Sequence, residues 1–140
     1  MFAFMSFGAP PAETNSPELE RGFPAQPESV PEARRFVLNA AGSGYTQVDE
    51  RLSALVSELA TNAILHARTP FRVKVWRDGS RTRVSVSDHS TSGPITREYA
   101  PSQPTGRGLM IVESLADRWG VTPDHDGKTV WFEIDYQENG

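Results

Sequence analysis

The chain has 140 residues, of which 37% are hydrophobic and 23% charged, and its net charge is −4. This size and composition are typical of one soluble domain with its own hydrophobic core, and the acidic balance argues against a broad nucleic-acid-binding surface. The chain has no cysteine, which excludes disulfides and thiolate zinc sites, and it has no apolar run long enough to cross a membrane. We therefore expect a cytoplasmic domain that binds neither nucleic acid nor membrane.

The first part of the chain is rich in proline and shows no periodic pattern. We expect residues 1–22 to form a disordered or loosely attached tail, followed by a single domain over residues 23–140. The first helix is expected from Ser29 to Ala41, with Ser29 as its N-cap and Gly42 at its end.

The longest helical pattern runs from Asp49 to Ala67 and contains no glycine or proline. Its apolar residues recur at the spacing of a core-facing stripe. Glu58, Asn62 and His66 follow one another at intervals of four and form a second line along the helix. A carboxylate and a carboxamide among apolar neighbours need polar partners, and a bound metal–phosphate group is one candidate. We expect His66 to be packed or hydrogen-bonded rather than catalytic.

After this helix the apolar period becomes strand-like. Alternating valines predict strands over residues 71–77 and 82–88, joined by a turn at Asp78-Gly79-Ser80. Residues 89–107 show no periodicity, and a structureless loop of this length inside a domain usually serves a site.

The last part of the chain predicts a helix over Leu109–Trp119 and two strands at 120–122 and 128–135. The helix directly follows Thr105-Gly106-Arg107-Gly108, and a glycine-flanked helix start exposes backbone N–H groups that bind phosphate readily. The order of elements indicates an α+β fold. We expect a two-layer α/β sandwich, with the helices on one face of a mainly antiparallel sheet.

Three weak motifs stand in a fixed order: Glu58-x-x-x-Asn62 on a helix, Asp88 at a strand end, and Gly106-x-Gly108 before a helix. Together they resemble the ATP-binding fold of the histidine kinase-like ATPases, the GHKL superfamily, which histidine kinases, gyrase-type topoisomerases, Hsp90 and MutL share. The match is closest to the single-domain branch, the anti-sigma factors that act as serine protein kinases.

Two longer stretches carry this resemblance. LVSELATNAILHA, residues 55–67, is very similar to the N box of that branch, and GRGLMIVESLADRWG, residues 106–120, looks like its G2 box and the following helix. The resemblance covers about residues 23–135. It implies a histidine kinase-like ATP-binding domain over residues 23–140, with residues 89–107 as its lid.

The resemblance also implies a function. It suggests an ATP- and Mg²⁺-binding serine/threonine protein kinase that phosphorylates an anti-anti-sigma partner and regulates transcription by partner switching. A sigma factor is a further candidate partner, and proteins of this branch commonly dimerise. The alternative is a nucleotide-responsive, protein-binding regulator that has lost phosphotransfer.

The resemblance assigns roles to matching residues. Asn62 matches the magnesium ligand, and Glu58 matches the residue proposed as general base for a partner's serine hydroxyl. Orienting a water or a magnesium ligand remains the alternative for Glu58. Asp88 matches the carboxylate that accepts a hydrogen bond from the adenine amino group, which disfavours guanine because an ionised carboxylate only accepts. The other expected nucleotide contacts are Gly106, Arg107, Gly108, Leu109 and Thr129. A solvent-facing arginine and an outward strand threonine remain the alternatives for Arg107 and Thr129.

The sequence departs from the family pattern in two respects. Ser90 stands where the family usually has a glycine, two residues after the aspartate, and the phosphate-accepting histidine box of two-component sensors is missing. Asp88-His89-Ser90 does not indicate a hydrolase triad, because triads are assembled from separated segments. The three histidines match no compact zinc spacing. Arg34 and Arg35 are the candidate partner-surface residues, with solvated arginines as the alternative.

Overall fold

The computed structural model describes residues 4–7, 18–89, 104–124 and 126–136. Its strands are β1 (Phe4–Phe7), β2 (Glu18–Phe23), β3 (Phe71–Arg77), β4 (Arg81–Asp88), β5 (Arg118–Asp124) and β6 (Gly127–Asp135). Its helices are α1 (Ser29–Ala41), α2 (Thr46–Asn62), which continues into the π-helical turn η1 (Ala63–Ala67), and α4 (Pro104–Leu115).

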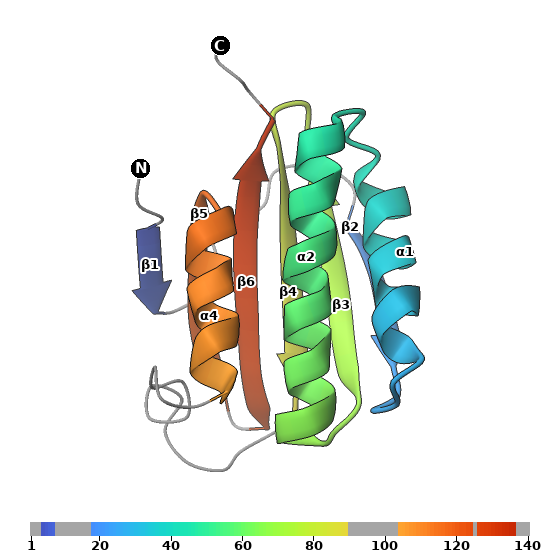
Figure 1. Cartoon of the computed structure of the whole chain (residues 1–140), viewed down its shortest axis with the longest axis vertical. Helices are drawn as coiled ribbons and strands as arrows, with labels where there is room; N and C mark the ends of the chain where they lie inside the picture. The colour runs from blue at the N-terminus through green and yellow to red at the C-terminus, as the bar shows by residue number, and fades with distance from the viewer. Residues whose placement is uncertain (1–3, 8–17, 90–103, 125, 137–140) are drawn as a thin grey trace.

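The six strands form one sheet in the order β1-β5-β6-β4-β3-β2. Neighbouring strands are antiparallel except for β1 and β5, which are parallel. The described helices all lie over the same face of the sheet (Figure 1). The expected α+β sandwich with a mainly antiparallel sheet is therefore confirmed. None of the helices in the described ranges combines the length and apolar composition needed to span a membrane.

Strand alternation decides which side chains enter the core between the sheet and the helices. In the central pair of strands, Val84 and Val86 of β4 lie opposite Phe132 and Val130 of β6, and all four belong to the core. The helices add the fully buried side chains Val37, Leu52, Leu55 and Val56.

The first helix has the predicted bounds, but its N-terminal contact differs. At its end, Gly42 adopts φ 50°, and its N–H donates to the carbonyl oxygen of Leu38 at 3.0 Å, as expected for a C-terminal glycine. Ser29 is not the N-cap. It lies within the first turn, and its hydroxyl donates to the carbonyl oxygen of Pro24 at 2.7 Å. Ser29 therefore fixes the chain entering α1 instead of capping its free N–H groups.

The N-terminal segment contains structure where a loosely attached tail was expected. Within residues 1–22, the structure has β1 and most of β2, which begins at Glu18; residues 1–3 and 8–17 lie outside the described part. β2 pairs with β3 along its whole length. The sequence of β2 does not predict a strand, because five of its six residues are exposed and most of its side chains are polar.

The last helix starts and ends earlier than predicted. α4 runs from Pro104 to Leu115, and a proline at the first turn costs no helical hydrogen bond. Trp119 was expected on the helix face, but it lies in β5, buried in the core and opposite Phe132 of β6. Of the expected lid, residues 90–103 lie outside the described residues, and residues 104–107 belong to α4.

An ion-pair network lies on the face of the sheet that carries no described helix. Glu133 alternates with the core residues of β6, yet its side chain is only 1% exposed. The Oε1 atom of Glu133 accepts a hydrogen bond from Nε of Arg118 at 2.6 Å, and its Oε2 atom accepts one from Nη1 of Arg83 at 3.3 Å. The pKa of the Arg118 guanidinium lies above its ordinary value, chiefly because Asp135 also accepts a hydrogen bond from it and secondarily because of Glu133.

Replacing this buried carboxylate should destabilise the fold. Glu133→Gln leaves the buried Arg83 without its charged partner, and we expect the free energy of unfolding to fall by about 3 kcal/mol. The matched control is Glu20→Gln, which breaks an exposed pair with Arg72 (2.8 Å) and should cost less than about 1 kcal/mol. Urea denaturation measures both. Equal losses in the two variants would contradict a buried network at Glu133.

Candidate functional site

Glu58 and Asn62 lie on the side of α2 that faces α4. Arg51 belongs to the same line, because residues seven apart on a helix return to nearly the same angle. The Nε of Arg51 donates to the carbonyl oxygen of Leu115, the last residue of α4, at 2.8 Å. The two helices run in opposite directions (Figure 1), so the C-terminal end of α2, with Asn62, lies toward the start of α4.

A second contact of Arg51 fixes α4 at the same end of this helix pair. The Asp117 carboxylate accepts from Nη2 of Arg51 at 3.3 Å and from the backbone N–H of Asp135 at 2.7 Å. Asp117 lies two residues after the end of α4, so it connects α2, the end of α4 and β6. This polar clamp sets where the first turn of α4 lies relative to Asn62.

Asn62 is the last α-helical residue of α2, and the helix widens immediately after it. In the π-helical turn, the N–H of Arg68 donates to the carbonyl oxygen of Ala63 at 2.8 Å, five residues back, and Arg68 adopts φ 58°. Such turns occur often at functional sites. The expected helix over residues 49–67 is therefore present, but it begins earlier, at Thr46, and its last turn is π-helical.

The Asn62 amide has an unsatisfied atom. Its Nδ2 is buried and has no hydrogen-bond partner within the described residues. Such a group costs free energy unless a ligand or water contacts it. Rotating the amide exchanges its nitrogen and oxygen, and a side-chain oxygen is a hard donor of the kind that Mg²⁺ binds. The residue thus fits the predicted magnesium ligand.

Any metal at Asn62 would need most of its ligands from a substrate. Among the described residues, no group of three or more histidine, aspartate or glutamate side chains is arranged to hold a metal ion. Mg²⁺ typically takes one or two protein ligands, while phosphate and water oxygens complete its shell. A lone Asn62 is consistent with that pattern.

Glu58 lies one helical turn before Asn62 and is half-buried. Within the described part of the chain, no hydrogen bond or ion pair engages its carboxylate, so the residue is in a position to accept a proton or orient a ligand. His66 is exposed and has no hydrogen bond within the described residues, so the expectation that it is packed or hydrogen-bonded is wrong.

Asp88 is the last residue of β4 and shares the helix-facing alternation of Val84 and Val86. Its carboxylate Oδ2 accepts a hydrogen bond from Nζ of Lys128 at 3.0 Å, and the two side chains are only 9% and 7% exposed. Lys128 lies directly opposite Asp88 in the register of β4 and β6. No sequence pattern marks this lysine, because only the strand register brings it to Asp88.

Thr129, the predicted adenine-pocket residue, lies elsewhere. Successive residues of a strand point to opposite faces, so Thr129 faces away from the helices while Lys128 faces them. The Thr129 hydroxyl instead pairs with the Ser87 hydroxyl at 2.7 Å. The structure thus brings Asp88 together with Lys128 and not with Thr129. The alternative interpretation, an outward strand threonine, describes this placement.

The glycines expected before the last helix lie inside it. Gly106 and Gly108 are the third and fifth residues of α4, which begins at Pro104. By position, the N–H of Gly106 is among the first four of the helix, which have no intrahelical partner, whereas the N–H of Gly108 is not. The predicted contacts of the Arg107 and Leu109 side chains lie outside the described residues.

A close backbone approach holds the start of β6 against the end of β4. A Cβ atom on Gly127 would lie 1.9 Å from the carbonyl oxygen of Asp88 and 2.7 Å from the Cα of His89. Any side chain here would force the strands apart. Gly127 therefore permits the register that places Lys128 on Asp88.

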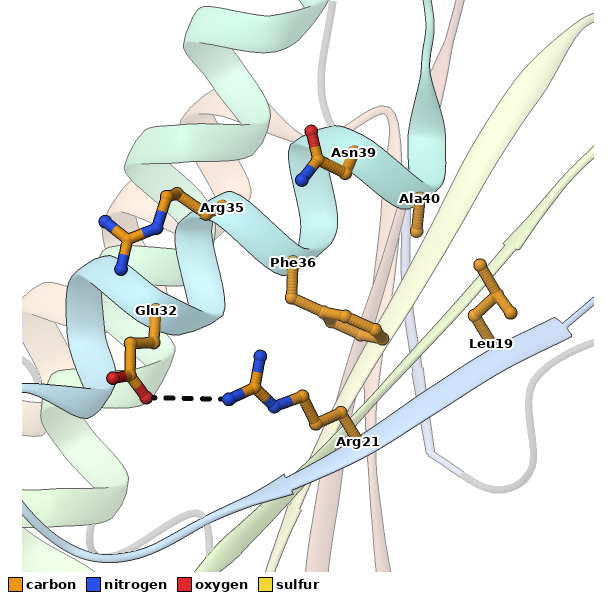
Figure 2. A pocket seen from close by; sticks show the side chains of 7 residues that line it. All are labelled: Leu19, Arg21, Glu32, Arg35, Phe36, Asn39 and Ala40. Carbon is orange, nitrogen blue, oxygen red and sulfur yellow. Dashed lines mark ion pairs between the residues drawn. The ribbon is translucent and has the colours of Figure 1, made fainter.

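A cavity of about 420 Å³ lies between α1 and β2, away from the residues above. Figure 2 shows the ion pair between Arg21 and Glu32, 3.7 Å apart, at this cavity. Of the two arginines named as candidate partner-surface residues, Arg35 lines the cavity, while Arg34 donates to the hydroxyl of Ser57 at 3.0 Å. Arg34 therefore has a structural role in joining α1 to α2.

Comparison with known proteins places the chain in a family. The model of the histidine kinase-like ATPase domain matches residues 23–134, so the chain belongs to the histidine kinase-like ATPase domain family. The chain is also similar to a solved structure, that of the RsbU and RsbW domains of Rv1364c from Mycobacterium tuberculosis, with a TM-score of 0.65 and 17% identity. The similarity covers 85% of this chain and 32% of that chain and concerns the fold alone. No curated protein matches the chain.

The close approach at Gly127 is open to a direct test. We expect Gly127→Ala to lower the free energy of unfolding by about 2 kcal/mol or more, because the added methyl group overlaps the Asp88 backbone. The matched control is Gly79→Ala, in the β3–β4 turn, where a Cβ meets nothing within 4 Å. It should change stability by less than about 0.5 kcal/mol. If both variants unfold at the same urea concentration, the described contact between β6 and Asp88 is wrong.

Proposed function

We propose that the protein binds ATP with Mg²⁺ where α2 and β4 end and α4 begins, and that it is a serine/threonine protein kinase of the anti-sigma type (Figure 1). The observation that carries the proposal is the buried, unpartnered Nδ2 atom of Asn62 at this end of a histidine kinase-like ATPase domain. A metal–phosphate ligand would give that amide a partner, and the π-helical turn that follows it is of a kind found often at functional sites.

Each part of the site has a role in nucleotide binding. Asp88 accepts a hydrogen bond from the base, and the free N–H of Gly106, with the positive end of the α4 dipole, favours phosphate. Asn62 supplies a protein oxygen to Mg²⁺. When bound, the metal neutralises charge that develops on the phosphate oxygens.

Glu58 is proposed as the general base of phosphoryl transfer. It takes the proton of a partner's serine hydroxyl as that oxygen forms a bond to the γ-phosphorus of ATP. The bond from the γ-phosphorus to its bridging oxygen breaks, and ADP leaves with the electron pair. The position of Glu58, half-buried and one turn from Asn62, supports this role.

The proposed substrate is a small anti-anti-sigma protein, and a sigma factor is the proposed alternate partner in the switch. Support for these partners comes from the resemblance of residues 55–67 and 106–120 to the anti-sigma kinase branch. The name of the structural neighbour, which includes an RsbW domain, points in the same direction.

A second candidate function is a nucleotide-responsive regulator without phosphotransfer. Two observations favour it. Ser90, two residues after Asp88, stands where the family usually has a glycine. The Asp88 carboxylate also already has an ammonium partner in Lys128. This regulator would use the same pocket but not Glu58.

Calorimetric titration of ATP, with and without Mg²⁺, tests the pocket. We expect magnesium-dependent binding to the wild type. Asn62→Ala should weaken it about tenfold or more by removing the metal ligand, and Asp88→Asn by a similar factor through loss of a charged acceptor. Asn39→Ala, an exposed asparagine on α1, is the matched control and should bind normally. Absence of binding to the folded wild type at millimolar ATP would overturn the proposal.

Transfer of label from radiolabelled ATP to purified anti-anti-sigma proteins separates the two candidate functions. Glu58→Gln should leave ATP affinity nearly unchanged and reduce transfer by about 10²- to 10⁴-fold, because the hydroxyl proton then has no acceptor. Glu50→Gln, on the exposed side of α2, serves as the control. Binding without transfer by the wild type, and no effect of Glu58→Gln, would favour the regulator.

A further inference from the structure

Two tryptophans are buried on the face of the sheet that carries no described helix. Trp131 of β6 is 2% exposed and Trp76 of β3 is 5% exposed, and neither belongs to the core between sheet and helices. The residues directly opposite Trp131 are Ser85 of β4 and Gly120 of β5, which are too small to cover an indole ring. Another part of the chain must therefore lie on this face.

Both indoles also lack a hydrogen-bond acceptor. The Nε1 atoms of Trp76 and Trp131 are buried and have no partner within the described residues. A buried indole N–H usually finds an acceptor, so the segment that covers this face should bring carbonyl oxygens to it. A proline-rich segment suits this purpose, because proline keeps its carbonyl oxygen and has no N–H that needs an acceptor of its own.

The chain between β1 and β2 has to cross the sheet. β1 ends at Phe7, β2 begins at Glu18, and the two strands are opposite edges, five strand spacings or about 24 Å apart. The ten intervening residues reach at most about 40 Å when fully extended. A path over the helices (Figure 1) adds a helix diameter in each direction and needs about 45 Å or more. The direct path over the helix-free face is within reach.

The end of this segment nearest β2 lies beside one of the tryptophans. Trp76 is directly opposite Glu18 in the register of β2 and β3. Pro17 immediately precedes Glu18 in the sequence. A chain that enters β2 from the helix-free face therefore brings Pro17 to Trp76.

The end nearest β1 leads to the other tryptophan. Trp131 lies on β6, two strands in from β1 and thus about 10 Å away. Three residues of a polyproline II chain cover about that distance. Counted from Phe7, the third residue is Pro10, and Pro11 follows it.

We infer that residues 8–17 bind across the helix-free face of the sheet as an extended, proline-rich segment that covers Trp131 and Trp76. Aromatic surfaces bind polyproline II chains in other proteins, because such a chain is already extended and loses little entropy on binding. The face is thus a docking site for the chain's own N-terminal segment. Partner proteins then have to bind the helical side of the domain or the ends of its strands.

Hydrogen exchange of the indole N–H groups, followed by NMR on the full chain, tests this inference. In the wild type, the indoles of Trp76 and Trp131 should exchange much more slowly than a free indole. Replacing two prolines, Pro10→Gly with Pro11→Gly, makes the bound conformation harder to hold. The indole of Trp131 should then exchange about tenfold faster or more, because the segment opens more often.

The chain offers two controls for this experiment. Trp119 also has a buried Nε1 without a partner among the described residues, but it lies in the core, so its exchange rate should not change. The variant Thr14→Gly with Asn15→Gly adds the same number of glycines and keeps the prolines. It should accelerate Trp131 much less than the proline variant does. Thermal unfolding checks that each variant is folded.

Disulfide formation locates the segment directly, because the chain has no cysteine of its own. Ala12 is five residues after Phe7, which places it over β4, three strands in from β1. Ala12→Cys with Ser85→Cys should therefore form an intramolecular disulfide, which needs Cα atoms within about 7 Å. Ala12→Cys with Glu50→Cys, on the exposed side of α2, is the control and should not.

Three outcomes would overturn the inference. A wild-type Trp131 indole that exchanges as fast as a free indole shows that nothing covers this face. An unchanged Trp131 rate in the folded proline variant, or an equal acceleration of Trp119, shows that the segment does not protect it. Equal disulfide yields from the two cysteine pairs show that the segment does not lie on this face. The wild-type rate and the disulfide yields decide the matter if the proline variant does not fold.

Discussion

The pairing of β4 with β6 is the constraint on which the rest of the structure depends. In the observed register, Val84 faces Phe132 in the core and Asp88 faces Lys128 at the strand ends. Because side chains alternate along a strand, a slip of one residue would turn the core residues outward and bring the buried Glu133 toward the helices. The same register thus sets the core, the ion-pair network and the candidate base site.

Much of the fold was predictable because its signals are local. The bounds of α1 follow from its apolar spacing and Gly42, and those of β3 from its alternating valines. β2 was not predictable, because an exposed polar strand has no apolar alternation and forms only where β3 offers it a partner. The end of α4 was misplaced because Trp119 fits a helical spacing, whereas its pairing opposite Phe132 makes it a strand residue.

The candidate site was predictable to the extent that a family resemblance fixes positions in sequence. Glu58, Asn62 and Asp88 were identified in this way, and the structure places Glu58 and Asn62 on one line of α2. Lys128 was not identified, because one sequence holds no information on which residue lies across from Asp88. Lys128 and Thr129 are consecutive residues of β6, and consecutive side chains of a strand point to opposite faces of the sheet.

The placement of β1 and β2 has a consequence for the behaviour of the chain in solution. They are adjacent in sequence, yet they form the two opposite edges of the sheet, and both begin before the family match at residue 23. Open strand edges recruit strands of other molecules. Here the outermost strands are a segment of only four residues and one bearing three charges, Glu18, Glu20 and Arg21. Both edge strands thus carry features, short length in β1 and charge in β2, that oppose edge-to-edge pairing with another molecule.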